Sequence, residues 1–362
     1  MAEPRPAPGR LARTPFPSPG TVSPCPGADA HAALLGSLAG RIDEVLRPLV
    51  PADRPVALLD SPLTPNVGDS MIWLGALSYL ASRGIRPCYT CDLRTFSPGT
   101  LRRRIGGGTI LLSGGGNFGD LYPPHQEFRE AVVARFPGNR IVQLPQSIFF
   151  QSPEALTGAR QVLDRHPDLT LLTRDASSLA LAGRSFRAPS LLCPDISFAL
   201  GAQSRPCPPS HPVVWLARRD KEAREPLAPA PAGVLRVDWV EDDATLLVRS
   251  HRRLTRILSH HSGLRAPLGD ALARASDAVA RARVERGSRL LSSGRVVITS
   301  RLHGHVLCML LGIRHIMLDN SYGKVRGAYE TWTHASPLAE LALSQADALA
   351  RAAALTAAAR EA

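Results

Sequence analysis

The chain has 362 residues, of which 44% are hydrophobic, and this is enough to close the cores of about two domains, so a wholly disordered chain is excluded. Aromatic residues make up only 5% of the chain, which argues against a binder of single-stranded nucleic acid lined with aromatic side chains. The formal net charge is +12, which fits nucleic acid, an anionic membrane or an acidic metabolite as partner, and composition cannot choose among the three.

The first 30 residues are dense in Pro and Gly, which predicts a disordered tail. They lack the apolar core of a secretory signal, and no stretch of the chain offers about 20 uninterrupted apolar residues for a membrane span. We therefore expect a cytoplasmic protein. Cys88 and Cys91 have the spacing of a zinc or redox pair, but no second pair completes a zinc site, so ordinary thiols are expected.

Residues 31–204 alternate short apolar runs with amphipathic helices. The expected strands are 55–60, 87–90, 109–113, 140–145, 170–174 and 190–193. The expected helices are 32–50, 69–83, 98–104, 124–136, 153–165 and 176–181. This alternation predicts a parallel sheet covered by helices on both faces, and hence a first Rossmann-like domain.

A second alternating unit, 205–335, follows a stretch rich in chain breakers at 201–212. Its expected strands are 212–219, 234–240, 295–300 and 315–319, and its expected helices are 243–261, 268–290 and 304–311. The Ala-rich end, 336–362, is predicted to be helical. The fold class is therefore α/β, with two doubly wound Rossmann-like domains facing a cleft that binds ligands at the carboxyl ends of strands.

The segment Asn66-Val67-Gly68-Asp69 lies between an expected strand and an expected helix. Free backbone N–H groups and the positive end of the helix dipole at such a place suit an anion or a sugar hydroxyl. Asn66 and Gly68 are expected to line the cleft. Asp69 is either a catalytic residue or a simple helix N-cap.

A run of glycines follows the expected strand at 109–113. Gly115, Gly116 and Asn117 are expected to line the cleft, because successive glycines let the backbone approach a ligand and can form an N–H nest, although a tight turn is the alternative. Arg174 and Asp175 follow another strand, and they are either cleft residues or a surface ion pair.

The segment Ser300 to His305 follows the strand at 295–300. Arg301 offers a planar fork for a phosphate or a carboxylate, and His303 can donate or accept a proton near neutral pH. We expect both to point into the cleft, whereas His305 is expected to be a capping or surface residue.

Three further cations stand at the ends of expected strands. Arg218 and Arg219 follow one strand, and Lys324, one of only two lysines in the chain, comes shortly after another, beyond Asn320. A lysine in this place suits a point-charge contact with phosphate.

Taken in order, these segments resemble the polysaccharide pyruvyl transferase family. The resemblance spans about residues 35 to 335 and rests on NVGDSMIWLGALSYL, GGGNFGDLY, RIVQLPQSIFF, LLTRDASS with CPDISFAL, SRLHGHVLCMLLG and LDNSYGKV. It implies a GT-B-like pair of Rossmann-type domains that transfers an enolpyruvyl-derived group from phosphoenolpyruvate to two hydroxyls of a sugar, giving a pyruvate ketal. It also implies donor binding by Arg301, Leu302 and His303, and by Arg218 or Arg219.

The chemistry of this reaction suits the candidate residues. Arginine forks match the phosphate and the carboxylate of phosphoenolpyruvate, and we expect Asn320 and Lys324 to join them. Ketal formation needs an acid for the methylene carbon, for which His303 is the candidate unless it only orients the donor, and a base for the attacking hydroxyl, for which Asp69 is the candidate. The scheme needs no metal and no cofactor, and its acceptor is a free, polymeric or lipid-linked sugar.

The positive charge is concentrated between residues 249 and 301, where twelve arginines stand against three acidic residues. Asp277 with Arg281 and Glu285 with Arg289 have the spacing of surface pairs on a helix. We expect the other arginines to surround the site of the anionic donor.

Two other functions fit the same residues. A nucleotide-sugar glycosyltransferase of GT-B type has the same architecture, and fold alone cannot separate the two chemistries. A basic, non-enzymatic binder of polyanions is the second alternative. We expect pyruvyl transfer, with no nucleic-acid partner and at most a peripheral contact with the inner face of the membrane.

Overall fold

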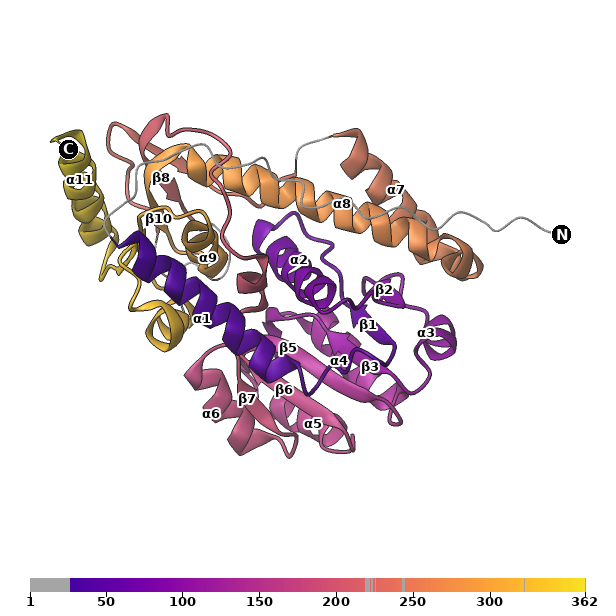
Figure 1. The fold of residues 1–362 in the computed structure, drawn as a ribbon. Helices are drawn as coiled ribbons and strands as arrows, with labels where there is room; N and C mark the ends of the chain where they lie inside the picture. Colours follow the sequence, from indigo (N-terminus) through magenta and orange to yellow (C-terminus); the bar gives the residue numbers. More distant parts are fainter. Residues whose placement is uncertain are drawn as a thin grey trace.

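The computed structural model describes residues 27–218, 222, 224, 226–242, 245–321 and 323–361, and it shows an α/β fold built on two parallel sheets (Figure 1). This confirms the predicted α/β class. Most of the predicted tail, residues 1–26, and the candidate Arg219 lie outside the described residues. The first helix begins at Ala28, so it includes the last three residues of the predicted tail.

The first sheet has seven strands in the order β2-β1-β3-β5-β6-β7, with β4 also paired to β5. The strands are β1 (Val56–Leu59), β2 (Tyr89–Cys91), β3 (Thr109–Leu112), β4 (Gly115–Phe118), β5 (Arg140–Ile148), β6 (Leu169–Thr173) and β7 (Ser190–Leu192). All pairs are parallel, and β1, β3 and β6 are buried along their whole length, as expected for a sheet covered on both faces.

Seven helical segments belong to this part of the chain: α1 (Ala28–Leu46), α2 (Val67–Ser82), α3 (Pro98–Ile105), α4 (Pro123–Arg135), α5 (Pro153–Leu163), α6 (Ala176–Ser185) and the 3-10 segment η1 (Ile196–Leu200). The N-cap of α2 is Asn66, whose side chain accepts a hydrogen bond from the Gly68 N–H at 3.1 Å. Asp69 therefore does not cap the helix, and the alternative interpretation of this residue as an N-cap is wrong.

The second sheet has five parallel strands in the order β12-β11-β10-β8-β9. They are β8 (His211–Leu216), β9 (Val234–Val237), β10 (Gly294–Thr299), β11 (His315–Met317) and β12 (Ala339–Leu341). The strand β12 was not predicted. Its pairing with β11 adds an edge to the sheet, so the predicted helix at 336–362 starts only at residue 345.

The helical segments around the second sheet are α7 (Leu246–His260), η2 (Ser262–Leu264), α8 (Arg265–Ser292), α9 (Leu302–Leu310), α10 (Lys324–Ala328), the π-helical turn η3 (Tyr329–Thr333) and α11 (Gln345–Glu361). None of the helices in the described ranges combines the length and the apolar character needed to cross a bilayer.

The order in which successive strands are added to the sheet reverses once in each sheet, and at the corresponding place. In the first sheet β1 lies between β2 and β3, and in the second sheet β8 lies between β9 and β10. The crossover connections leave such a central pair of strands toward opposite faces, so a crevice opens beyond their carboxyl ends, where open α/β sheets bind ligands.

Helix α8 and a common core join the two sheets. Figure 1 shows α8 running across the molecule, and it contacts α2 and β2 on one side and β8 and β10 on the other. The indole Nε1 of Trp73 donates to Asp277 Oδ1 at 2.7 Å, and one hydrophobic cluster includes both Val67 and Leu216. The two crevices are therefore held facing each other.

Candidate active site

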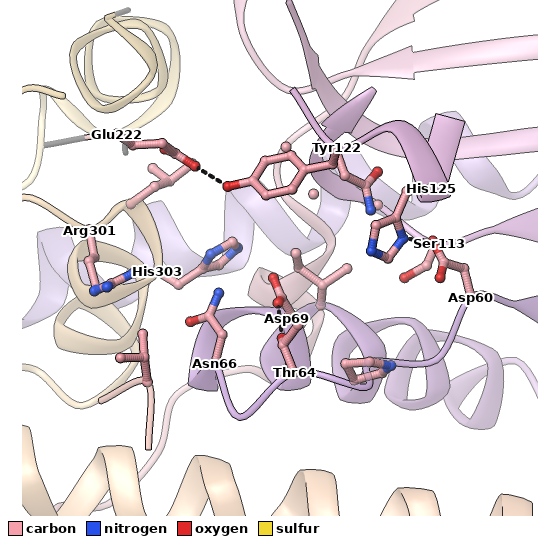
Figure 2. Close-up of a pocket in the computed structure, with 18 of the residues that line it drawn as sticks. Asp60, Thr64, Asn66, Asp69, Ser113, Tyr122, His125, Glu222, Arg301 and His303 are labelled. Carbon is pink, nitrogen blue, oxygen red and sulfur yellow. Dashed lines mark hydrogen bonds and ion pairs between the residues drawn. The ribbon is translucent and has the colours of Figure 1, made fainter. Parts of the chain in front are cut away.

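A cavity of about 470 Å³ lies between the two crevices (Figure 2). The first sheet contributes the loop after β1, the segment 113–117 after β3, and Tyr122 and His125. The second sheet contributes Arg218 after β8, residues 301–303 after β10, and Lys324. A cavity of this size at the carboxyl ends of parallel strands is the natural place for a small ligand.

Most of the predicted site residues line this cavity. They are Asn66, Asp69, Gly115, Gly116, Asn117, Arg174, Arg218, Arg301, Leu302, His303 and Lys324. Gly68, Asp175 and Asn320 are not on its wall but stand directly behind it, in the contacts described next.

His303 lies in the first turn of α9 and is held from two directions. Its Nε2 lies 3.3 Å from Asp195 Oδ2, and its ring packs on the backbone of α2 at Gly68. A Cβ at Gly68 would come within 2.5 Å of His303 Nδ1, so only glycine leaves room for the imidazole here. Gly68 therefore positions His303 instead of lining the cavity.

Asp195 links His303 to Arg174. Arg174 Nη1 lies 2.7 Å from Asp195 Oδ2, and both side chains are buried. Burial alone would raise the pKa of Asp195, but the charge and hydrogen bond of His303 and the charge of Arg174 outweigh burial and hold this pKa well below its usual range. Asp195 thus stays a carboxylate that holds two cavity residues in place.

Arg174 and Asp175 are not a surface pair, since each is 2% exposed. Asp175 caps α6 by accepting from the Ser178 N–H at 2.7 Å, and it accepts from the Ser147 hydroxyl at 2.7 Å. The same Ser147 oxygen accepts from Arg174 Nε at 3.0 Å. Asp175 therefore orients Arg174 through Ser147.

Glu222 is the centre of a second charged group and was not predicted. It pairs with Arg218 at 2.8 Å and with Lys324, and it accepts from the Tyr122 hydroxyl at 2.9 Å and from Asn320 Nδ2 at 3.3 Å (Figure 2). Burial is the main cause that lowers the pKa of Lys324 to about 8, against the opposing charge of Glu222. No sequence pattern marks Glu222, because three of its partners are 98 to 102 residues away and the four-residue spacing to Arg218 is also that of an ordinary surface pair.

Arg301 is fixed by the end of β9. Its Nε and Nη2 donate to the two oxygens of Asp238 at 2.7 and 2.8 Å. The structure describes all twelve arginines between 249 and 301, and among them Arg301 alone lines the cavity. Others serve structure, such as Arg283, which donates to Asp242. The prediction that this cluster surrounds the donor site is therefore wrong.

The glycine segment forms a short strand and not the predicted open nest. Residues 115–118 are β4, and the Asn117 N–H donates to Gln146 Oε1 at 3.2 Å. A Cβ at Gly116 would lie 3.1 Å from Arg174 Nη2, so the lack of a side chain at Gly116 leaves room for the guanidinium of Arg174.

His125 and Asp60 form a dyad on the wall that β1 and α4 supply. His125 Nδ1 lies 2.8 Å from Asp60 Oδ2, and Asp60 has a backbone φ of 71°, which is the only positive φ outside glycine among the described residues. Burial alone would lower the pKa of His125, but the carboxylates of Asp60 and Asp69 outweigh burial and raise it. Sequence reasoning missed both, since they fell within an expected strand and an expected helix.

His305 is not a capping or surface residue. It is fully buried, with Nδ1 2.7 Å from His315 Nε2 and Nε2 2.9 Å from Thr333 Oγ1. The ring packs between α9, β11 and η3, where it completes the core of the second sheet, so the prediction for His305 is wrong.

The described residues hold no group of three or more His, Cys, Asp or Glu side chains that could bind a metal ion. Cys88 and Cys91 are free thiols, and burial raises the pKa of each. This agrees with the expectation that they are ordinary thiols.

Comparison with known proteins places this site in a family. Residues 66–322 match the family described as Polysaccharide pyruvyl transferase. The Bacillus subtilis (strain 168) protein named "Putative pyruvyl transferase EpsO" is 32% identical over 317 residues, which cover 85% of this chain and 93% of that protein. Pyruvyl transferase 1 of Schizosaccharomyces pombe (strain 972 / ATCC 24843) is 34% identical over 295 residues, covering 78% of this chain and 71% of that protein.

The crystal structure of an uncharacterized protein from Klebsiella pneumoniae subsp. pneumoniae NTUH-K2044 has the same fold, with a TM-score of 0.56 and 14% identity over 85% of this chain and 99% of that one. The family match extends from the cap of α2 to the loop before α10, and so includes 18 of the 24 residues of the cavity wall. On these matches, the chain belongs to the polysaccharide pyruvyl transferase family.

Proposed function

We propose that this protein transfers the enolpyruvyl-derived group of phosphoenolpyruvate onto two hydroxyls of a sugar acceptor and so forms a pyruvate ketal. The acceptor is a sugar of a cell-surface polysaccharide or glycoconjugate, and the reaction takes place in the cytoplasm or at the inner face of the membrane. Family membership supports pyruvyl transfer, and the cavity supports the choice of donor.

The observation that carries this proposal is the arrangement of cations in the cavity. Arg174, Arg218, Arg301 and Lys324 all line it, together with His303. Glu222 pairs with Arg218 and Lys324, Asp195 pairs with Arg174 and His303, and Asp238 pairs with Arg301, so the cationic groups are held in fixed positions on the cavity wall. A wall that carries four cationic side chains suits a donor with a phosphate and a carboxylate.

The residues divide into two roles across the cavity. His303 protonates the methylene carbon of the donor or orients it, and Asp69, on the opposite wall, takes a proton from an acceptor hydroxyl. Arg218, Arg301, Leu302 and Lys324 contact the donor. Asn66 and residues 115–117 face the acceptor.

This division supports a GT-B-like interpretation of the two sheets. The first sheet and its helices, within residues 31–204, would be the acceptor domain, and the second sheet, within 205–335, would be the phosphoenolpyruvate domain. The cavity wall agrees with it, because the groups assigned to the donor come from the second sheet and its loops.

The test is incubation with phosphoenolpyruvate and a panel of galactose, glucose and N-acetylmannosamine derivatives, with phosphate release and the mass of the ketal as readouts. We expect both with at least one acceptor, and their loss in His303→Ala. If His303→Ala keeps the wild-type turnover, the role of His303 is wrong.

The two rival functions give different results in the same assay. Thermal stabilisation by a nucleotide sugar but not by phosphoenolpyruvate would identify a glycosyltransferase, because only a ligand of the folded state raises its stability. Binding to any polyanion that falls steeply with salt, without release of phosphate, would identify a simple binder.

A further inference from the structure

The proposed reaction has to remove two hydroxyl protons, one from each acceptor oxygen that bonds to the ketal carbon. The inference below rests on that proposed function. Asp69 accounts for one proton, and the two events occur at different oxygens and different stages. A second group able to accept a proton in the same cavity, on the acceptor side, would serve the second oxygen while Asp69 still carries the first proton.

We propose that His125, held by Asp60, is the base for the second acceptor hydroxyl. Asp69 serves the first hydroxyl, whose attack forms the tetrahedral adduct, and His125 serves the second hydroxyl, whose attack closes the ketal ring. His125 is then a catalytic residue, and Asp60 is its positioning residue.

The geometry supports this assignment. Figure 2 shows Asp69 rising from the first turn of α2, with His303 on one side and His125 on the other. All three side chains line the cavity. A carboxylate can only accept a hydrogen bond, so the 2.8 Å contact requires that His125 Nδ1 carries the proton and leaves Nε2 as the acceptor nitrogen of the neutral ring.

Asp60 is built in an unusual way for this task. It comes directly after β1, at the point where the first sheet reverses, and its φ of 71° places a non-glycine residue in the left-handed region. Its Oδ1 is buried and has no hydrogen-bond partner, while Oδ2 holds His125. Backbone strain combined with an unpaired carboxylate oxygen is typical of functional sites.

The charges around His125 fit a base that works near neutral pH. It faces Asp60 from the end of β1, Asp69 from α2 and Arg129 from its own helix α4. The two carboxylates stabilise the imidazolium that forms when the ring takes a proton, and Arg129 opposes them. The ring is 24% exposed at its side chain, so an acceptor hydroxyl can reach it.

The atoms balance over the two steps. In the first, the acceptor oxygen bonds to C2 of phosphoenolpyruvate, C3 gains a proton from the acid and becomes a methyl group, and the hydroxyl proton passes to Asp69. In the second, the bond from C2 to the phosphate oxygen breaks, the second acceptor oxygen bonds to C2, and its proton passes to His125. That proton is finally lost with the departing phosphate or to water.

The first test uses His125→Asn in D₂O with phosphoenolpyruvate and an active diol acceptor. The Asn side-chain N–H can keep the bond to Asp60, but the acceptor nitrogen is gone. We expect ketal formation to fall by about 100-fold, the size typical of a lost general base. The first addition still occurs and reverses, so recovered phosphoenolpyruvate gains deuterium at C3, and only when acceptor is present.

The controls separate this proposal from the proposed function itself. Asp69→Asn should lose both ketal formation and the deuterium exchange, and His260→Asn, at the exposed end of α7, should keep the wild-type values. If His125→Asn forms ketal within tenfold of the wild-type rate, or loses the exchange along with the ketal, the proposal is overturned. A wild-type enzyme without ketal formation on any acceptor instead overturns the proposed function.

A second variant, Asp60→Asn, tests the dyad without removing the ring. Asn is among the few residues that tolerate a positive φ, so the turn is retained. Loss of the carboxylate makes His125 easier to deprotonate, so the acidic limb of the kcat profile should move to lower pH, with kcat reduced and the KM for phosphoenolpyruvate unchanged. An unshifted profile with a raised KM would mean that Asp60 has only a structural role.

Discussion

At the scale of single residues, the site depends on carboxylates that pair with its cationic groups. Asp195, Asp238 and Glu222 are each buried or nearly so, and each fixes a cation or an imidazole of the cavity wall. A buried arginine or lysine without such a partner is costly, and the carboxylate also limits its rotamers. The cavity is thus preorganised before a ligand enters.

Gly68→Ala should displace the imidazole of His303, since the new Cβ would lie 2.5 Å from Nδ1. We expect turnover to fall by about 100-fold, as for other misplaced catalytic groups. The matched control is Gly36→Ala in α1, which has open space around its Cβ position and should gain up to about 1 kcal/mol in stability with unchanged turnover. Wild-type turnover in Gly68→Ala would mean that the position of His303 is not critical.

Lys324 should make donor binding depend on pH. Its pKa of about 8 means that it loses its charge as the pH rises through 8, and the cavity then attracts phosphoenolpyruvate less strongly. We expect the Kd, measured by calorimetry between pH 7 and pH 9, to rise over this interval, and Lys324→Arg to flatten the rise. A Kd that is constant from pH 7 to pH 9 would exclude Lys324 from donor binding.

At the scale of elements, the long strand β5 shows how the sheet accommodates the site. Its first half pairs with β3 and its second half with β4, and the ladder is broken between them. Two glutamine side chains of β5 satisfy the carbonyl at the break, because Gln143 and Gln146 donate to Ser113 O at 2.8 and 3.1 Å. The bend directs Gly116 toward Arg174.

The second sheet contains an acid-sensitive contact. His305 and His315 are buried against each other, and burial lowers the pKa of His305 well below 6.5 and that of His315 to about 4. The unfolded chain binds protons near pH 6.5, so it binds more protons than the folded state between about pH 6.5 and pH 4. Stability should therefore be full above pH 6.5 and fall as the pH drops toward 4.

The measurement is the unfolding midpoint in urea at pH 7.5, 6.5, 5.5 and 4.5. His315→Asn should lower the midpoint at pH 7.5 and weaken its dependence on pH. A variant that keeps the full wild-type slope would show that other groups cause the loss at low pH.

At the scale of the whole molecule, α8 and the shared core make one body of the two sheets. Trp73 and Asp277 form a part-buried hydrogen bond between α2 and α8, whereas Arg104 and Asp270 form an exposed ion pair between α3 and α8 at 2.6 Å. The two links differ in burial and in charge, and we expect the less exposed one to contribute more to stability.

Trp73→Phe removes the indole N–H that donates to the half-buried carboxylate of Asp277 and should destabilise the fold by about 1–3 kcal/mol. Asp270→Asn, at a carboxylate that is 63% exposed, should change stability by less than about 0.5 kcal/mol. Urea unfolding of both variants is the measurement. Equal effects would contradict a central role of the part-buried link in joining the sheets.

Much of this molecule follows from its sequence, and the remainder has a physical cause. The parallel strands and the residues that follow them were predictable, since apolar runs and glycine turns are local signals: Arg301 and His303 stand where the pattern puts them. Glu222, Asp195 and the dyad of Asp60 with His125 were not, because their partners in the cavity, Arg218 apart, are from 21 to 108 residues away and only the folded sheets bring them together.

The strand β12 and the burial of His305 were missed for the same reason, since an edge pairing and a core position depend on neighbours in the second sheet. For the charged cluster at 249–301, the local pattern instead predicted a binding role that the structure does not show. Its local density resembles a binding surface, but Arg283 is used to hold Asp242, and most of its other members lie on α7 and α8.

Each sheet contributes one crevice to the cavity, and the two sheets have matching strand order around it. If the first sheet receives the acceptor and the second the donor, the two substrates are recognised by separate sets of loops. Acceptor preference can then change by substitutions at 62–66 and 113–117 while the donor wall and the dyad of Asp60 with His125 stay intact. Related enzymes would then differ in their acceptor sugar while sharing phosphoenolpyruvate as donor. Exchanging these loops between relatives would transfer the sugar preference.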